Sequence, residues 1–288
     1  MLVSVVIPVY RRPLAANAAI RSVLIETGVN VELIIVDDGS PEPFVMAPDN
    51  ALDPRVRLVR NELNAGAAAA RNRGVREARG RWIALLDSDD LWRPGKLAAQ
   101  RTFAEAAQAA GAPPLTTFVT GFSQVNLATG GRRNRVPIDA DKPEDFAAGC
   151  WFAPGSTSLI PRTAFERVGL FDERLERLED LDWFLRLSLA GGRVLTLQSI
   201  WADVQVGSRP TRERLDRAIS LLREKWLGSQ GYHLSRRARR HLAAYLWIEV
   251  ASNRYHQADW LEFLWAYVRS WILVPRLRPH LKDWWSVR

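Results

Sequence analysis

The sequence predicts an α/β fold in which a mostly parallel sheet is flanked by helices. Apolar runs and helical spacings alternate over the first 86 residues, with apolar runs at 3–7, 31–36, 56–59 and 82–86 and helical spacings at 15–25 and 67–78. Short apolar runs of this kind are typical of buried strands. Strands that alternate with helices pair in parallel through right-handed crossovers, so we expect a Rossmann-like nucleotide-binding sheet.

Beyond this alternation the elements become less regular. Pro94 occupies a favoured first-turn position of a helix, and the Gly-Ala-Pro-Pro segment 111–114 ends that helix. The later pattern is strand-like at 118–122 and 156–160, polar and loop-like at 129–145, and helical at 179–190.

A domain boundary is predicted at the Gly-Ser-Arg-Pro segment 207–210. Residues 1–208 would then form a catalytic domain, and residues 209–288 a basic, Trp-rich helical region. From residue 205 onward the chain has 16 Lys and Arg against 7 Asp and Glu, and seven of the twelve tryptophans lie between Trp226 and the C-terminus. This composition predicts contact with something anionic or apolar.

The most apolar part of the C-terminal region is the predicted helix 258–274. Its polar positions Glu262 and Arg269 are seven residues apart, which leaves a narrow polar stripe on an apolar helix. Such a helix either packs on protein, in this chain or in a second subunit of a homo-oligomer, or makes peripheral contact with a membrane; both alternatives stay open. It is too short and too charged to span a bilayer. No nucleic-acid partner is expected, because the basic region contains no recognisable binding module.

The cellular compartment is indicated by two features. Cys150 is the only cysteine, so no intrachain disulfide can form, which fits a reducing compartment. The N-terminal residues lack the basic and long apolar regions of a leader peptide. We therefore expect a cytoplasmic protein, and contact with the inner face of a bacterial cell membrane is an alternative that the helix 258–274 leaves open.

An acidic cluster follows the fourth predicted strand. Asp87, Asp89 and Asp90 are delivered together at the carboxyl end of the run 82–86, where open α/β sheets bind ligands. Crowded carboxylates repel one another, and a divalent cation would remove that repulsion. Their hard oxygen ligands favour Mg²⁺ or Mn²⁺. The alternative is a solvated turn that caps the next helix.

Other polar side chains are predicted at the same sheet edge. Asp38 ends the second strand, where its carboxylate can accept a nucleobase N–H; uracil N3–H suits this role, and an Asx turn is the alternative. Tyr10 follows the first strand and could stack on a base or act as a rim aromatic. Glu179 and Asp180 precede an apolar helical face, where acidic residues also complement the helix dipole.

Five motifs occur in one order along the chain. They are Ser4–Tyr10, Val36–Ser40, Asn64–Gly66 with Ala70–Asn72, Gly80–Asp90, and Glu179–Asp180. In this order, over roughly residues 2–208, the chain closely resembles the inverting family 2 glycosyltransferases of the GT-A fold, which carry a DxD motif. The resemblance implies a GT-A sheet followed by an α-helical C-terminal extension.

The resemblance also implies roles for the donor-binding residues. Asp38 resembles the acid that holds uracil N3, with Tyr10 near the base and Pro8 supplying backbone close to it. Asp87 resembles the first acid of the DxD motif and is expected near the ribose. Arg71 either neutralises the nucleotide or braces the fold, and both alternatives stay open.

Two further acids complete the implied site. Asp89 matches the last acid of the DxD motif and is expected to ligate Mn²⁺ or Mg²⁺ on the diphosphate. Asp180 resembles the catalytic base that takes the proton of the acceptor hydroxyl. Two departures from the family pattern are Arg11, in place of a common asparagine, and Gln205, where many relatives have a histidine.

The sequence thus predicts a metal-dependent inverting glycosyltransferase in surface polysaccharide synthesis. It would move a sugar from a nucleoside diphosphate sugar, expected to be UDP-linked, to a hydroxyl of a glycan or polyprenyl-linked glycan. One alternative is a catalytically inactive, membrane-associated scaffold. Another is a sugar-1-phosphate nucleotidyltransferase, which should carry a glycine-rich basic loop where this chain has residues 8–13.

Overall fold

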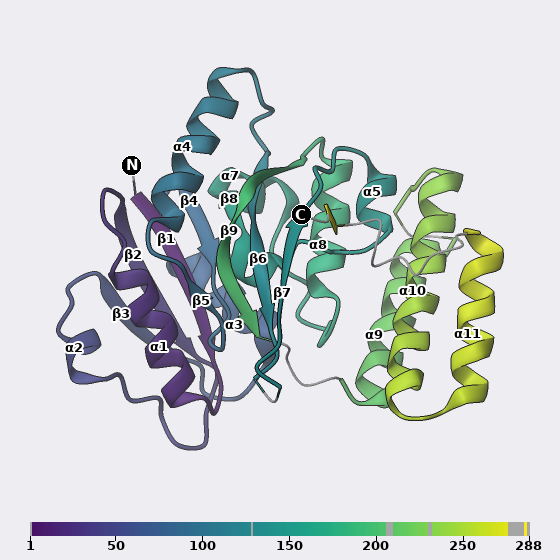
Figure 1. Cartoon of the computed structure of the whole chain (residues 1–288), viewed down its shortest axis with the longest axis horizontal. Coiled ribbons are helices and arrows are strands. Elements are labelled where there is room, and N and C mark those ends of the chain that lie inside the picture. Colours follow the sequence, from purple (N-terminus) through teal and green to yellow (C-terminus); the bar gives the residue numbers. More distant parts are fainter. Residues whose placement is uncertain (1, 128, 206–209, 230–231, 276–284, 287–288) are drawn as a thin grey trace.

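The N-terminal half of the sheet is parallel, as predicted. The computed structural model describes residues 2–127, 129–205, 210–229, 232–275 and 285–286. The parallel strands stand in the order β4-β1-β2-β3, with bounds β1 (Leu2–Val9), β2 (Asn30–Asp37), β3 (Val56–Arg60) and β4 (Trp82–Leu85). They are connected by α1 (Pro13–Leu24), α2 (Pro48–Ala51) and α3 (Gly66–Glu77) (Figure 1). Because parallel strands end at the same edge, the segments after β1, β2 and β4 come together there.

The second half of the sheet is mixed. After β5 (Leu91–Trp92) and α4 (Lys96–Ala109), β6 (Thr117–Val125) runs parallel to β9 (Val194–Gln205). β6 runs antiparallel to β7 (Arg132–Pro137) and β8 (Leu159–Pro161). β8 also pairs antiparallel with β4, and β5 pairs antiparallel with β9. Between these strands lie α5 (Pro143–Ala147), α6 (Pro154–Thr157), α7 (Arg162–Val168) and α8 (Glu179–Leu189).

Two sequence-based expectations in this half are wrong. The segment 129–145, predicted as a loop, contains β7 and the start of α5. β7 has few apolar residues, and its pairing with β6 specifies it instead. The strand predicted over 156–160 is a short helix, α6, followed by β8, because the left-handed backbone of Ala153 (φ 47°) and the first-turn Pro154 start a helical turn there.

The sheet carries a core on each face. Successive side chains of a strand point to opposite faces, so Val5 and Ile7 of β1 belong to the core with α1 and α4, whereas Val6 belongs to the core with α3 and α8. Gly74 lets α3 approach β1 closely, since a Cβ there would lie 2.2 Å from Val6 Cγ1. The close packing on both faces holds the strand ends in place.

The C-terminal region is helical, as predicted, with α9 (Arg212–Leu227), α10 (Arg236–His256) and α11 (Trp260–Leu273). The two-residue strand β10 (Trp285–Ser286) pairs with β7. In Figure 1, α9, α10 and α11 stand side by side beyond α5 and α8, with α11 outermost. No helix in the described part of the chain has the length and apolarity needed to cross a membrane. Part of the predicted boundary, residues 207–209, lies outside the described residues, and the division at 208/209 stays a prediction.

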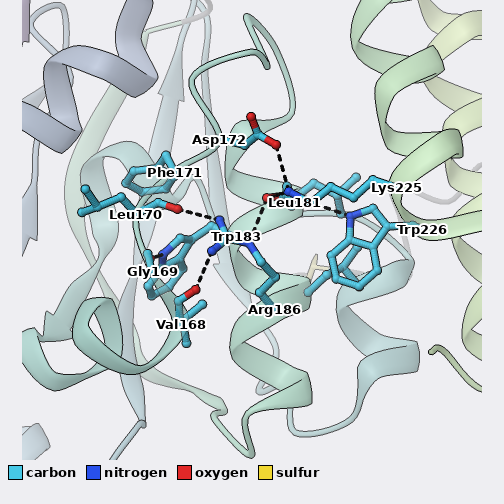
Figure 2. Close-up of polar contacts among 12 residues, drawn as sticks. Val168, Gly169, Leu170, Phe171, Asp172, Leu181, Trp183, Arg186, Lys225 and Trp226 are labelled. Atoms are coloured by element: carbon cyan, nitrogen blue, oxygen red, sulfur yellow. Dashed lines mark hydrogen bonds and ion pairs between the residues drawn. The ribbon is translucent and has the colours of Figure 1, made fainter. Parts of the chain in front are cut away.

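Helices α8 and α9 are joined through a buried carboxylate. Asp182 on α8 accepts hydrogen bonds from Trp226 Nε1 at 2.9 Å and Arg186 Nε at 3.0 Å, and Lys225 Nζ lies 2.8 Å from its Oδ1. Figure 2 shows Trp226 and Lys225 reaching from α9 toward α8, with Arg186 also directed at the Val168–Leu170 backbone. A buried charge requires such paired donors. The C-terminal region is therefore packed on the helix that begins with Glu179 and Asp180.

Candidate active site

A cavity of about 190 Å³ lies at the carboxyl end of β4. Asp87 and Asp90 line it from the turn after β4, and Glu179 and Asp180 line it from the first turn of α8. Tyr245 of α10 contributes to the wall from the C-terminal region. The structure thus brings together acids that are about 90 residues apart in the sequence.

Strained backbone surrounds this cavity. Of the described residues, four that are not glycine have a positive φ. Two of them, Ala153 (φ 47°) and Leu178 (φ 62°), line the cavity, and a third, Arg11 (φ 56°), lines a neighbouring one. Such backbone costs about 1–3 kcal/mol per residue and gathers at functional sites. Leu178 directly precedes α8, so its conformation aims Glu179 and Asp180 into the cavity.

Arg71 ties the two acidic segments together. Its Nη2 donates to Asp87 Oδ1 at 2.7 Å and its Nη1 donates to Glu179 Oε1 at 2.6 Å. Burial disfavours the guanidinium charge, but the two carboxylates outweigh it and raise the pKa of Arg71 above its usual value. Arg71 is therefore a permanent cation that fixes the distance between the turn after β4 and α8.

Asp180 has a pKa above that of an ordinary carboxyl group. Burial, followed by the neighbouring Glu179, raises its pKa to about 6, while Arg177, the Leu181 N–H and Arg71 act in the opposite direction. The Leu181 N–H donates to Asp180 Oδ1 at 2.7 Å. A carboxylate with such a pKa can accept a proton from a hydroxyl near neutral pH.

The acidic cluster after β4 repels itself. Burial, then Asp87, and finally Asp89 raise the pKa of Asp90 to about 8, although Ser156 Oγ and the Gln205 N–H both donate to it, at 2.5 and 2.8 Å. Asp89 forms an ion pair with Arg12. Gln205, which stands where many relatives have a histidine, contacts this cluster through its backbone N–H.

The donor set is compatible with a hard cation. Asp87 and Asp89 keep partly exposed carboxylates, which are oxygen ligands of the kind that Mg²⁺ and Mn²⁺ prefer. Within the described ranges, no three His, Cys, Asp or Glu side chains are grouped so that they could hold a metal ion. A cation held by these two carboxylates would have to take its remaining ligands from substrate or water.

Asp38 lies outside the lining of the 190 Å³ cavity and is bonded to the loop before α3. It accepts hydrogen bonds from Asn61 Nδ2 at 2.9 Å, from Ala65 N–H at 3.2 Å and from Gly66 N–H at 2.7 Å. A carboxylate has about four acceptor positions, so one remains for a further donor. Its role as the uracil acceptor stays a prediction.

A second cavity of about 520 Å³ lies at the end of β1, and neither Pro8 nor Tyr10 is among its lining residues. It is lined by the segments after β1 and β2, including Arg11, Arg12 and Phe44. Tyr10 is partly exposed at the end of β1 with the Arg11 guanidinium 5.2 Å from its ring centre. Pro8 is part of β1. Arg12 joins this cavity to Asp89, so the two hollows share one edge of the sheet.

Sequence reasoning missed several residues of the site. Asp90 and Glu179 stand inside motifs that the sequence indicates, but the resemblance implies no separate role for either of them. Arg12 follows the first motif, but nothing in the sequence indicates its pairing with Asp89. Tyr245 has no local signal at all, because its place in the wall depends on how α10 packs.

A comparison with protein families decides what this site belongs to. The model of glycosyl transferase family 2 matches residues 4–169, more than half of the chain. The chain belongs to glycosyl transferase family 2. The predicted family and the prediction of a glycosyltransferase are therefore confirmed.

Similar proteins include one named for succinoglycan biosynthesis and one named as a glucosyltransferase. The succinoglycan biosynthesis protein ExoO of Rhizobium meliloti is 44% identical over 110 residues, which are 38% of this chain and 31% of that protein. The Escherichia coli protein WfgD, a UDP-Glc:α-D-GlcNAc-diphosphoundecaprenol β-1,3-glucosyltransferase, is 42% identical over 99 residues, which are 34% of this chain and 39% of that protein. The matches thus span well under half of these relatives.

A solved structure confirms the predicted GT-A fold. Staphylococcus aureus TarS 1–349 in complex with UDP-GlcNAc superposes with a TM-score of 0.68 at 15% sequence identity, covering 96% of this chain and 82% of that one. At this identity the likeness concerns the fold. It extends over the mixed half of the sheet and the C-terminal helices as well as the family 2 segment.

Proposed function

We propose that this family 2 enzyme transfers a sugar from a UDP-sugar to a hydroxyl of a glycan or polyprenyl-linked glycan, with inversion at the anomeric carbon. The observation that carries the proposal is the placement of Asp180 in one cavity with Asp87, fixed by the Arg71 bridge. A base and a donor-binding acid that line one cavity fit a single in-line displacement.

The donor would lie along the sheet edge. Its nucleotide would use the hollow after β1 and β2, with Asp38 accepting from uracil N3 and Tyr10 and Pro8 beside the base. Asp87 would bind near the ribose. That a solved fold relative holds UDP-GlcNAc supports a uridine nucleotide, and the ExoO and WfgD names support surface polysaccharide synthesis.

Asp180 would act as the general base. The acceptor hydroxyl has a pKa far above 7, so it needs a positioned carboxylate to take its proton as the oxygen attacks the anomeric carbon. A pKa of about 6 keeps most Asp180 side chains ionised at neutral pH and makes them better proton acceptors than an ordinary carboxylate. A single in-line displacement, which forms no covalent intermediate, inverts the configuration of the anomeric carbon.

The leaving nucleoside diphosphate gains charge during transfer. We propose that Asp89 would hold Mn²⁺ or Mg²⁺ at its diphosphate, and when bound the cation would supply Lewis-acid stabilisation of that charge. Arg12, the ion-pair partner of Asp89, would place a positive charge beside the diphosphate.

The test is a nucleotide-release assay with a panel of UDP-, GDP- and dTDP-sugars, with and without Mn²⁺, on the wild type and on Asp180→Ala. We expect release from UDP-sugars only, lost in Asp180→Ala, while UDP binding measured by calorimetry changes less than about threefold. Wild-type turnover in Asp180→Ala would refute the base assignment. Absence of UDP binding in Mn²⁺ would favour a catalytically inactive scaffold.

A further inference from the structure

The outer side of α11 is an apolar surface on the described part of the chain. Large apolar side chains between 44% and 85% exposed follow one another along it: Trp260, Leu261, Leu264, Trp265, Val268, Trp271 and Ile272. At 3.6 residues per turn, these positions fill an uninterrupted arc of about 140° around the helix. No charged or polar side chain falls inside that arc. We call these seven residues the α11 face.

The opposite side of α11 is packed. Ala266 and Ser270 are buried, and Ser270 Oγ donates to the Ala244 carbonyl of α10 at 2.8 Å. The only acid of the helix, Glu262, is held by Arg254 Nε at 2.8 Å and also contacts Arg212. The helix therefore has its packing partner and its acid on the inner side, and the α11 face remains exposed.

The charges beside the α11 face are positive. Arg269 borders it, with its guanidinium carbon 4.7 Å from the Trp265 ring centre. At the C-terminal end of α11, the exposed Arg240 donates from Nη2 to the Leu273 carbonyl at 2.8 Å. An apolar helix face with tryptophans and a basic border is the composition of interfacial helices, because arginines are attracted to anionic lipid.

We propose that the α11 face docks on the surface of an anionic phospholipid bilayer, with α11 lying in the plane of the interface. At 14 residues the helix is about 21 Å long, enough to lie along the surface and too short to cross it. Lipid is favoured over a second copy of the chain, because two α11 faces placed together would also bring their positively charged borders together. It rests on α11 alone and is independent of the proposed transfer reaction.

The experiment is vesicle flotation with the full chain. Vesicles of phosphatidylcholine alone are compared with vesicles that also contain phosphatidylglycerol, at low and high salt. We expect binding to the anionic vesicles that is weakened by salt, and a loss of about 100-fold or more in the double variant Leu264→Glu/Trp271→Glu. The matched control, Leu14→Glu/Leu52→Glu, places the same charges on exposed leucines of α1 and after α2 and should bind like the wild type.

The possible outcomes distinguish lipid from a second copy of the chain as the partner of the α11 face. Absence of binding by the wild type, or equal binding by the α11 variant, would overturn the proposal. A dimer in light scattering that the α11 variant dissociates, without vesicle binding, would overturn it in favour of a second copy. Circular dichroism spectra and thermal unfolding like those of the wild type show that the variants are folded, and Asp180→Ala should float like the wild type, so failure here is distinct from failure of the proposed enzyme.

Discussion

The raised pKa of Asp180 predicts that removing its charge stabilises the fold while it abolishes transfer. The folded-state pKa is about 6 against 3.8 for the ordinary group, so the folded protein holds the proton more tightly than the unfolded chain does. Ionisation then costs the folded state up to about 3 kcal/mol above pH 6, a cost that shrinks as the pH falls and vanishes below about 3.8. Asp180→Asn carries no charge and escapes this cost.

Urea unfolding of Asp180→Asn and wild type at about pH 8 and about pH 4 measures the effect. We expect the variant to be more stable by about 1–3 kcal/mol at the higher pH and equal to the wild type at the lower. Glu62→Gln, at an exposed site, is the control and should leave stability unchanged at both. In the wild type, kcat/KM should be half-maximal near pH 6 and fall about tenfold per unit below it. An Asp180→Asn variant no more stable than the wild type at the higher pH would refute the burial argument.

Three further predictions concern the metal, the α8–α9 contact and the cavity wall. Asp89→Ala should abolish transfer and remove the Mn²⁺-dependent part of UDP affinity in calorimetry; an unchanged Mn²⁺ effect would contradict its role as ligand. Asp182→Ala should cost about 3–5 kcal/mol in urea unfolding, because it leaves Trp226 Nε1 without its acceptor and removes the carboxylate shared by Lys225 and Arg186; a loss below about 1 kcal/mol would rule this out. Gly149→Ala should lower stability by about 1–3 kcal/mol, since φ is 122° and the new Cβ would lie 2.4 Å from Tyr245 Cε2, and Tyr245→Ala in the same chain should recover part of the loss if that contact is the cause.

The predictable part of the fold is the part in which local pattern and burial agree. The apolar runs at β1, β2 and β4 are fully enclosed, so their strands follow from composition alone. β7 was missed because it is polar at its start, from Arg132 onward, and exists through its pairing with β6. α6 was missed because its four residues, Pro154–Thr157, carry no helical period.

The candidate site divides in the same way. Asp87 and Asp180 were recognisable because each stands in a motif at the end of a predicted element. The Arg71 bridge joins residues 16 and 108 positions away, and no spacing rule predicts such a pairing. The alternatives for Arg71 are now narrower, because its two ion pairs give it a bracing role whatever it does for the nucleotide.

The place of α10 limits how freely the C-terminal helices could be exchanged between relatives. Tyr245 forms part of the cavity wall, and its sequence neighbour Ala244 receives the hydrogen bond from α11. A chimaera that grafts on foreign helices would therefore import a new wall residue along with a new outer surface. A change in the C-terminal helices and a change in which substrates fit the cavity would be inherited together.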